Sequence, residues 1–400
     1  MKPLLFAIAA LALPLAAAAQ SVEQKLETMQ KEIDGLKAEM QRRPEQAPAA
    51  APDTTIFGYG EFNYNRFRDP DRTTRADLRR FVLGFGHRFN DQLSFMSEVE
   101  FEHGVVSADD KGEAEIEQAW LNYRFSDAVN AKGGLFLIPL GILNETHEPP
   151  TYYGVERNEV ETRIIPTTWR ELGLGVHGLV GEGWRYDVGV TTGFDAGKLD
   201  DPSFGIRSMH QEGSEANAYD LALYGALNYR APGLLVGGGY FTGNTGQNGQ
   251  TNPLLKGVDA RLRLWDVHAK YSIAGFDLQA LYASGTLGDA DKINTAILAT
   301  SSAPFAAPKA FSGWYAQAAY HLYRRGDVDL APFVRYERYD IHQQEDPANG
   351  LLQDPNNFER VTTVGFNLKI HPQVVIKSDV QAYQTDRNKS RFNIGLGYMF

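Results

Sequence analysis

QLSFMSEVEFE, residues 92–102, is the stretch of sequence that decides the fold. Leu93, Phe95, Val99 and Phe101 share one parity, and polar side chains fill most of the alternate positions. Successive side chains of an extended strand point to opposite faces, so this alternation predicts a strand with one apolar and one water-facing side.

The same two-residue period continues over residues 54–400, which we predict to form one domain. It indicates sixteen strands, at residues 55–67, 76–89, 92–103, 115–125, 129–140, 169–180, 184–193, 218–230, 234–243, 258–271, 274–284, 311–323, 327–340, 359–370, 373–383 and 391–400. Tight connections such as 90–91 and 272–273 alternate with long ones such as 141–168 and 194–217. Short turns that alternate with long loops are typical of outer-membrane barrels. We therefore predict an all-β fold, a 16-stranded antiparallel transmembrane β-barrel.

Three further segments precede the predicted barrel. Residues 1–19 combine a basic start with an apolar stretch and Ala17-Ala18-Ala19, which predicts a cleaved signal peptide. Residues 20–43 predict a short periplasmic coiled-coil helix, because apolar side chains recur at heptad spacing: Val22, Leu26, Met29, Ile33, Leu36 and Met40. Residues 44–53 are rich in Pro and Ala, which predicts a semi-stiff linker.

Composition narrows the classes of function. The formal net charge of −11 argues against a nucleic-acid partner, which would require a basic face. Cysteine is absent, as suits an exported chain that relies on backbone pairing rather than disulfides. The sequence contains no G-x-S-x-G, P-loop or H-E-x-x-H motif, and its histidines lack metal-ligand spacing. We therefore expect a pore that is not an enzyme and has no cofactor or metal. A barrel enzyme and a structural tether or adhesin stay open as alternatives.

Sixteen strands enclose a lumen wide enough for water, so the side chains that face inward decide what passes. Alternation turns both basic and acidic side chains into the lumen, including Arg80, Arg88, Arg124, Arg261, Arg263, Glu98, Glu100 and Glu102. Separated charges of this kind focus an electric field that selects ions by their charge. The alternative is that these charges only satisfy one another within the wall.

The connection 141–168 is long and rich in charged and aromatic side chains, which is typical of functional loops. We predict that it narrows the pore. Arg157 and Arg163 are candidate anion contacts, because a guanidinium group offers planar, forked donors to phosphate or carboxylate. The loop's other candidates for the constriction or for solute binding are His147, Tyr152, Glu156 and Glu159. An extracellular loop braced by salt bridges is the alternative.

The final strand ends in Tyr398-Met399-Phe400, which resembles the C-terminal signal that the outer-membrane assembly machinery reads. Tyr398 and Phe400 are therefore the candidate assembly residues.

Four motifs resemble those of the phosphate-selective porin O and P family: residues 134–141 (GLFLIPLG), 144–150 (NETHEPP), 155–158 (VERN) and 165–171 (IPTTWRE). The resemblance covers residues 54–400. It implies a homotrimer in the bacterial outer membrane, in contact with its lipids and lipopolysaccharide, with one pore in each subunit. It also implies passive diffusion of small polar solutes, and both phosphate and dicarboxylates or other organic anions stay open. Family members use a ladder of pore arginines, for which the candidates here are Arg80, Arg88, Arg124 and Arg157.

Overall fold

A computed structural model describes residues 53–199, 202–300, 307–343, 346–349 and 357–400. The predicted signal peptide, the predicted coiled coil and residues 44–52 of the predicted linker lie outside the described residues. The described chain from Asp53 to Phe400 forms one compact unit.

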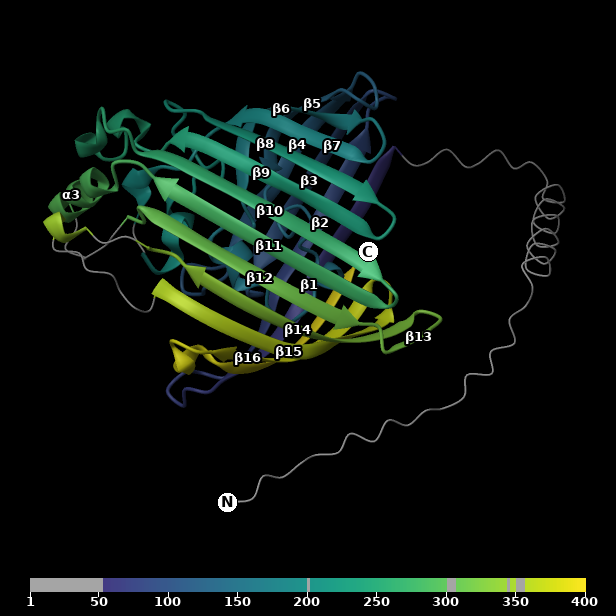
Figure 1. The fold of residues 1–400 in the computed structure, drawn as a ribbon. Coiled ribbons are helices and arrows are strands. Elements are labelled where there is room, and N and C mark those ends of the chain that lie inside the picture. Colours follow the sequence, from purple (N-terminus) through teal and green to yellow (C-terminus); the bar gives the residue numbers. More distant parts are fainter. Residues whose placement is uncertain (1–52, 200–201, 301–306, 344–345, 350–356) are drawn as a thin grey trace, which may run out of the picture. The chain divides into compact units, whose positions relative to one another are not determined.

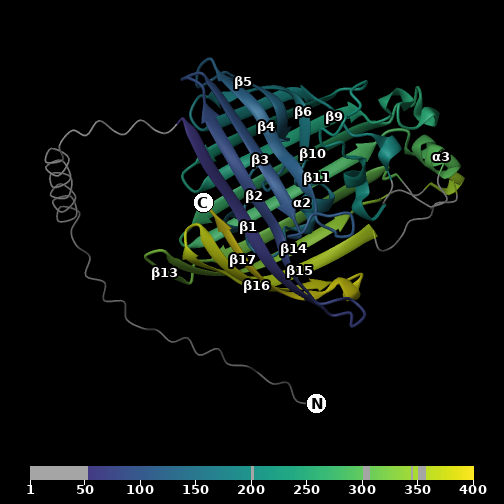
Figure 2. The same cartoon turned by 180° about the vertical axis from the view of Figure 1, so that it is seen from behind.

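The strands of this unit form a single antiparallel sheet that closes on itself (Figures 1 and 2). They are β1 (Thr54–Phe67), β2 (Arg75–Arg88), β3 (Leu93–Glu102), β4 (Ala114–Arg124), β5 (Asn130–Leu137), β6 (Arg170–Val180), β7 (Trp184–Thr191), β8 (Ala222–Ala231), β9 (Leu234–Asn244), β10 (Arg261–Ile273), β11 (Phe276–Leu287), β12 (Ala310–Tyr320), β13 (Tyr323–Arg325), β14 (Val328–Asp340), β15 (Phe358–His371), β16 (Val374–Tyr383) and β17 (Arg391–Met399). The pairing of β17 with β1, from Tyr59↔Met399 to Phe67↔Arg391, closes the barrel.

β12 and β13 form one interrupted strand. β12 pairs with β14 up to Ala319↔Phe333, and β13 continues along the same partner from Tyr323↔Leu330. The segment predicted at 311–323 covers β12 from its second residue and reaches only the first residue of β13. Counted in this way, the barrel has sixteen strands, and the predicted fold class is confirmed.

The long connections gather at one end of the barrel and the tight turns at the other (Figure 1). The helix α3 (Ala290–Thr300) belongs to the long connections. The predicted turn at 272–273 was wrong: Ala274 and Gly275, rather than Ser272 and Ile273, connect β10 to β11. Both have positive φ, 50° and 84°, which gives the tight turn between the two strands.

The outer surface of the barrel is apolar. Strand residues with exposed apolar side chains include Leu121, Leu174, Leu223, Val267, Val364 and Ile394. Every backbone group in hydrocarbon must be paired within the protein, and the closed sheet meets that demand while its outer side chains face lipid. No helix among the described residues has the length and apolar character needed to cross a membrane.

Part of the barrel interior is also apolar, which the alternation rule did not anticipate. Leu262 and Leu264 on β10 are fully buried in a cluster with residues of the long loops, such as Ile138, Leu140 and Trp169. β5 therefore ends at Leu137 rather than at 140, because the chain turns inward to join this cluster. Because Leu262 and Leu264 face the interior, the alternate positions of β10 face outward. The predicted inward direction was therefore wrong for Arg263, which is exposed, and for Arg261, which lies on the same face of the strand.

Candidate functional site

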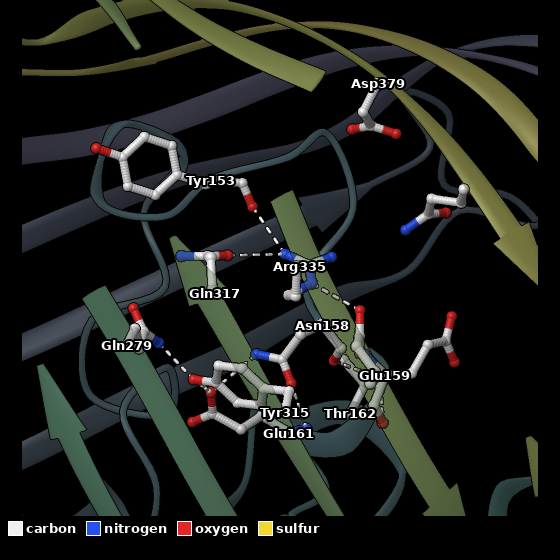
Figure 3. A network of polar contacts seen from close by, with 12 residues as sticks. Tyr153, Asn158, Glu159, Glu161, Thr162, Gln279, Tyr315, Gln317, Arg335 and Asp379 are labelled. Atoms are coloured by element: carbon white, nitrogen blue, oxygen red, sulfur yellow. Dashed lines mark hydrogen bonds and ion pairs between the residues drawn. The ribbon is translucent and has the colours of Figure 1, made fainter. Parts of the chain in front are cut away.

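The loop 141–168 lies inside the barrel, against the inner wall. Its backbone is held by side chains of three different strands (Figure 3 shows the contact of Arg335 with the loop). The contacts are Arg335 Nη1 to the Tyr153 carbonyl at 3.0 Å, Glu159 N to Glu337 Oε2 at 2.6 Å, Asn367 Nδ2 to the Tyr152 carbonyl at 2.9 Å, and Val155 N to Asp379 Oδ2 at 2.6 Å. The loop is therefore part of the lumen wall and narrows it.

Glu161 joins the two ends of this loop. Its buried carboxylate accepts hydrogen bonds from the backbone N–H of Leu143 at 2.7 Å, from Asn158 Nδ2 at 2.9 Å and from the Tyr315 hydroxyl at 2.8 Å (Figure 3). Asn158 also caps the short helix α2 (Glu159–Arg163) by accepting a hydrogen bond from the Glu161 N–H. A buried carboxylate needs several donors, and the base of the loop supplies them.

A cavity of about 280 Å³ lies between the loop and the strands that begin and end the barrel. Both positively and negatively charged side chains line this cavity. The lining arginines are Arg79, Arg80, Arg157, Arg163, Arg207 and Arg391, and the lining glutamates are Glu61, Glu100, Glu102, Glu113, Glu115, Glu156, Glu159 and Glu212. The loop also contributes Tyr152, Thr167 and Thr168.

Arg80 binds three of these carboxylates. Its Nε lies 2.9 Å from Glu61 Oε1, its Nη1 lies 3.1 Å from Glu100 Oε1, and its Nη2 lies 3.5 Å from Glu102 Oε1. The predicted opposition of Arg80 to the acids of β3 is therefore present as direct contact. The side chain is buried, so its charge is compensated inside the wall.

Arg163 is compensated by Glu159, one turn earlier on α2. The Tyr383 hydroxyl also donates to the Glu159 carboxylate. Burial alone would raise the pKa of Glu159, but Arg163 and then Arg391 outweigh burial and lower this pKa to about 2. Glu159 therefore stays ionised as a fixed counter-charge, which limits how freely Arg163 can contact a solute.

Arg157 differs from both. Its Nη1 donates to Thr168 Oγ1 at 3.3 Å, whereas its Nε and Nη2 have no hydrogen-bond partner. Among the described residues, no carboxylate lies within ion-pair distance of Arg157. Arg157 therefore has forked donors that protein groups leave unused.

The remaining predicted residues divide by position. Tyr152 lines the cavity and donates to Glu61 Oε2 at 3.0 Å, and Glu156 accepts from Asn65 Nδ2 at 2.8 Å. Glu98 accepts from Gln118, and His147 lies 3.1 Å from Glu117; neither lines the cavity. Arg88 and Arg124 end their strands beside the tight turns, where they pair with Asp53 and Asp127, respectively. Both lie outside the cavity.

Sequence reasoning missed Arg79, Arg207 and Arg391. Arg207 belongs to the connection between β7 and β8, and Arg391 begins the last strand. No short motif connects these positions to residues 141–168. Only the closed barrel and the inward path of two loops bring them to one cavity.

A closed barrel with an apolar exterior, and with a loop that narrows a charged lumen, defines the class of outer-membrane pores. The chain belongs to the phosphate-selective porin O and P family, which its sequence matches over residues 56–400. It is also 33% identical over 359 residues to an uncharacterized protein of Aquifex aeolicus (strain VF5), covering 86% of this chain and 80% of that protein.

Solved outer-membrane proteins share the fold. Salmonella typhi OmpF aligns with a TM-score of 0.60 at 13% identity, over 87% of this chain and 97% of that chain. The outer membrane channel DcaP of Acinetobacter baumannii aligns with a TM-score of 0.55 at 12% identity, over 88% and 98%. The trimer form of OmpT of Vibrio cholerae aligns with a TM-score of 0.52 at 11% identity, over 87% and 99%. At such identities the likeness concerns the fold alone. With the family, it makes this chain an outer-membrane porin.

Proposed function

We propose that this porin lets small polar solutes diffuse passively and prefers anions that carry a phosphate or carboxylate group. The observation that carries the proposal is the guanidinium group of Arg157, whose Nε and Nη2 have no partner in the narrowed lumen. An oxyanion can accept both hydrogen bonds of such a fork at once.

The neighbouring charges distinguish Arg157 from Arg80 and Arg163. Arg80 and Arg163 are each held by glutamates at short range, so they contribute little free positive charge. The strength of a charge in a confined lumen depends on what already compensates it. Arg157 therefore is the arginine of the constriction loop whose charge no carboxylate of the described residues pairs with directly.

We further propose that the mature chain acts as a homotrimer in contact with outer-membrane lipids and lipopolysaccharide, with residues 20–43 as a periplasmic coiled coil. The family and the trimer form of the similar OmpT barrel support the trimer. Tyr398 and Phe400 would present the assembly signal at the end of the strand that closes the barrel.

The first experiment measures single-channel currents of the full-length, signal-processed chain in planar bilayers. We expect conductance steps in groups of three and, under a KCl gradient, a reversal potential that indicates a preference for chloride. Replacement Arg157→Ala should reduce that preference, because it removes the uncompensated charge. Arg124→Ala serves as the matched control, since Arg124 is an exposed arginine outside the cavity.

Two results would contradict the proposal. A reversal potential that indicates cation preference in the wild-type chain would remove the anion assignment and leave a general porin. An unchanged reversal potential in Arg157→Ala would remove this residue from the selective part of the pore. A barrel that conducts no ions would instead favour the structural tether.

A further inference from the structure

A second guanidinium group, that of Arg207, lines the same cavity as that of Arg157. Arg207 comes from the connection between β7 and β8, and its Nη1 donates to the Thr167 carbonyl at 2.6 Å and to the Pro166 carbonyl at 3.2 Å. Arg157 contacts the next residue, Thr168. Two loops that are distant in the sequence thus bring two arginines to the same three-residue segment.

Among the described residues, neither of these like charges forms a direct ion pair with a carboxylate. In the part of the chain that the structure describes, no carboxylate lies within 4.0 Å of either guanidinium group. Burial lowers the pKa of Arg207; the Glu212 carboxylate opposes this change, and the charge of Arg157 adds to it. Like charges at short range in a partly buried site repel, and an anion between them would relieve the repulsion.

Unused donors gather at the same place. Arg157 Nε, Arg157 Nη2 and the Thr167 hydroxyl are buried and have no hydrogen-bond partner. Buried polar groups in native proteins are nearly always paired, so unpaired donors beside an uncompensated charge indicate the position of a missing acceptor. A carboxylate group has the charge and the two oxygen atoms that this cluster requires.

A different part of the same cavity has carboxylates with capacity to bind a cation. Glu113 lines the cavity and, among the described residues, forms no ion pair. Its carbonyl accepts from the backbone N–H of Glu102 at 2.9 Å, so the two residues are neighbours. Glu102 makes the longest of the three Arg80 contacts, at 3.5 Å, and its carboxylate therefore retains capacity for a second cation.

We propose that this cavity selects zwitterions, namely small amino acids whose carboxylate binds between Arg157 and Arg207 and whose ammonium group is held by Glu113 and Glu102. The cavity volume of about 280 Å³ is below that of pockets for drug-sized ligands, which suits a solute of this size. The inference rests on the proposed function, because it requires an open pore.

The test compares two solutes with the same carbon skeleton. L-aspartate and succinate both carry two carboxylates, and only aspartate carries an ammonium group. Uptake of each labelled solute is measured in proteoliposomes that contain the full-length, signal-processed chain. We expect the wild-type porin to take up aspartate faster than succinate by roughly two- to fivefold, the size of effect that a partly exposed ion pair produces.

Two variants test the ammonium-binding end and the carboxylate-binding end of the proposed site separately. Glu113→Gln should bring the aspartate-to-succinate ratio close to one, because it removes a carboxylate that would hold the ammonium group. Glu182→Gln is the matched control, because Glu182 is an exposed glutamate in a tight turn outside the cavity, and it should keep the wild-type ratio. Arg207→Gln should slow the uptake of both solutes, because both carry the carboxylate that it would contact.

The outcomes distinguish this inference from the proposed function. Equal wild-type uptake of the two solutes, or a ratio that Glu113→Gln leaves unchanged, overturns zwitterion selection even if Arg157→Ala still reduces anion preference. Uptake that is unchanged in Arg207→Gln overturns the two-arginine carboxylate site. A chain that forms no conducting pore in bilayers overturns the proposed function itself.

Discussion

Arg80 and Arg157 have the same side chain and line the same cavity, yet their neighbours give them different properties. Arg80 lies between three glutamates, so its charge is balanced and its donors are engaged. Arg157 contacts a threonine hydroxyl and keeps two donors unused. Residue type alone therefore does not identify an anion contact. An anion contact is identified by how far the neighbouring groups compensate the charge of each arginine.

His147 offers a test at the residue scale. Its Nε2 lies 3.1 Å from Glu117 Oε1 inside the barrel. Burial lowers the pKa of His147, but the Glu117 carboxylate outweighs burial, and the net pKa is raised. A raised pKa means that protonated His147 stabilises the fold fully below the unfolded value of about 6.5, and that this contribution is lost as the pH rises through the folded pKa.

We therefore expect the wild-type barrel to be less stable to heat at a pH above the folded pKa of His147 than at about pH 6, and His147→Gln to differ less between the two. Thermal unfolding in detergent, followed by circular dichroism at both pH values, measures the difference. His371→Gln is the control, because His371 lies exposed at a strand end. An equal loss of stability in wild type and His147→Gln would rule out this ion pair as a source of the pH dependence.

At the scale of elements, the seam between β1 and β17 closes the barrel, and glycines on β1 allow close packing there. A Cβ at Gly58 would lie 2.4 Å from the Val82 carbonyl oxygen and 3.0 Å from the ring of Phe400. Gly58 and Phe400 also exchange backbone hydrogen bonds of 3.1 and 2.9 Å. The C-terminal residue thus pairs directly with the first strand.

Gly58→Ala should lower the free energy of unfolding by about 1–3 kcal/mol, because the backbone of β2 cannot move away from the new methyl group without loss of pairing. Gly225→Ala provides the comparison, since a Cβ at that strand glycine would meet its nearest neighbour at an ordinary 3.5 Å. Urea unfolding of the detergent-solubilised barrel compares the two. Similar midpoints for both variants would show that close packing at the seam contributes little.

At the scale of the whole molecule, the barrel and the segment before it have separate tasks in our proposal. The barrel carries its constriction entirely within residues 53–400, because every residue that lines the cavity belongs to that range. The predicted coiled coil would then serve subunit association or reach into the periplasm, and would leave the pore itself unaffected.

Deletion of residues 21–52 should leave the conductance and the reversal potential of each pore unchanged, since no lining residue is removed. Single-channel recording of the deletion variant beside the full-length chain measures both quantities. The yield of trimers on native gels indicates separately whether the coiled coil helps the subunits to associate. Altered selectivity of the remaining pores would contradict the separation of tasks.

The sequence by itself determined the barrel. Alternation over residues 54–400 predicts strands with one apolar and one polar side, and the alternating connection lengths set their order and number. The physical reason is local: a strand repeats every two residues, and lipid permits only closed pairing of its backbone. The same rule named Arg80, Glu100 and Glu102 as wall charges, and the composition of residues 141–168 indicated the loop that enters the lumen.

Only the tertiary structure decided which charges meet. Alternation predicts which side of the barrel wall a side chain faces, but not how far along the barrel axis it lies. It therefore could not separate Arg80, which lines the cavity, from Arg88, which lies beside a tight turn. It also assumed a polar interior, which failed at Arg263 because loop residues bury apolar side chains inside the barrel. Arg207 reaches Thr167 across 40 residues of sequence. Contacts of that kind depend on the paths of two loops through a closed barrel, and no local period encodes them.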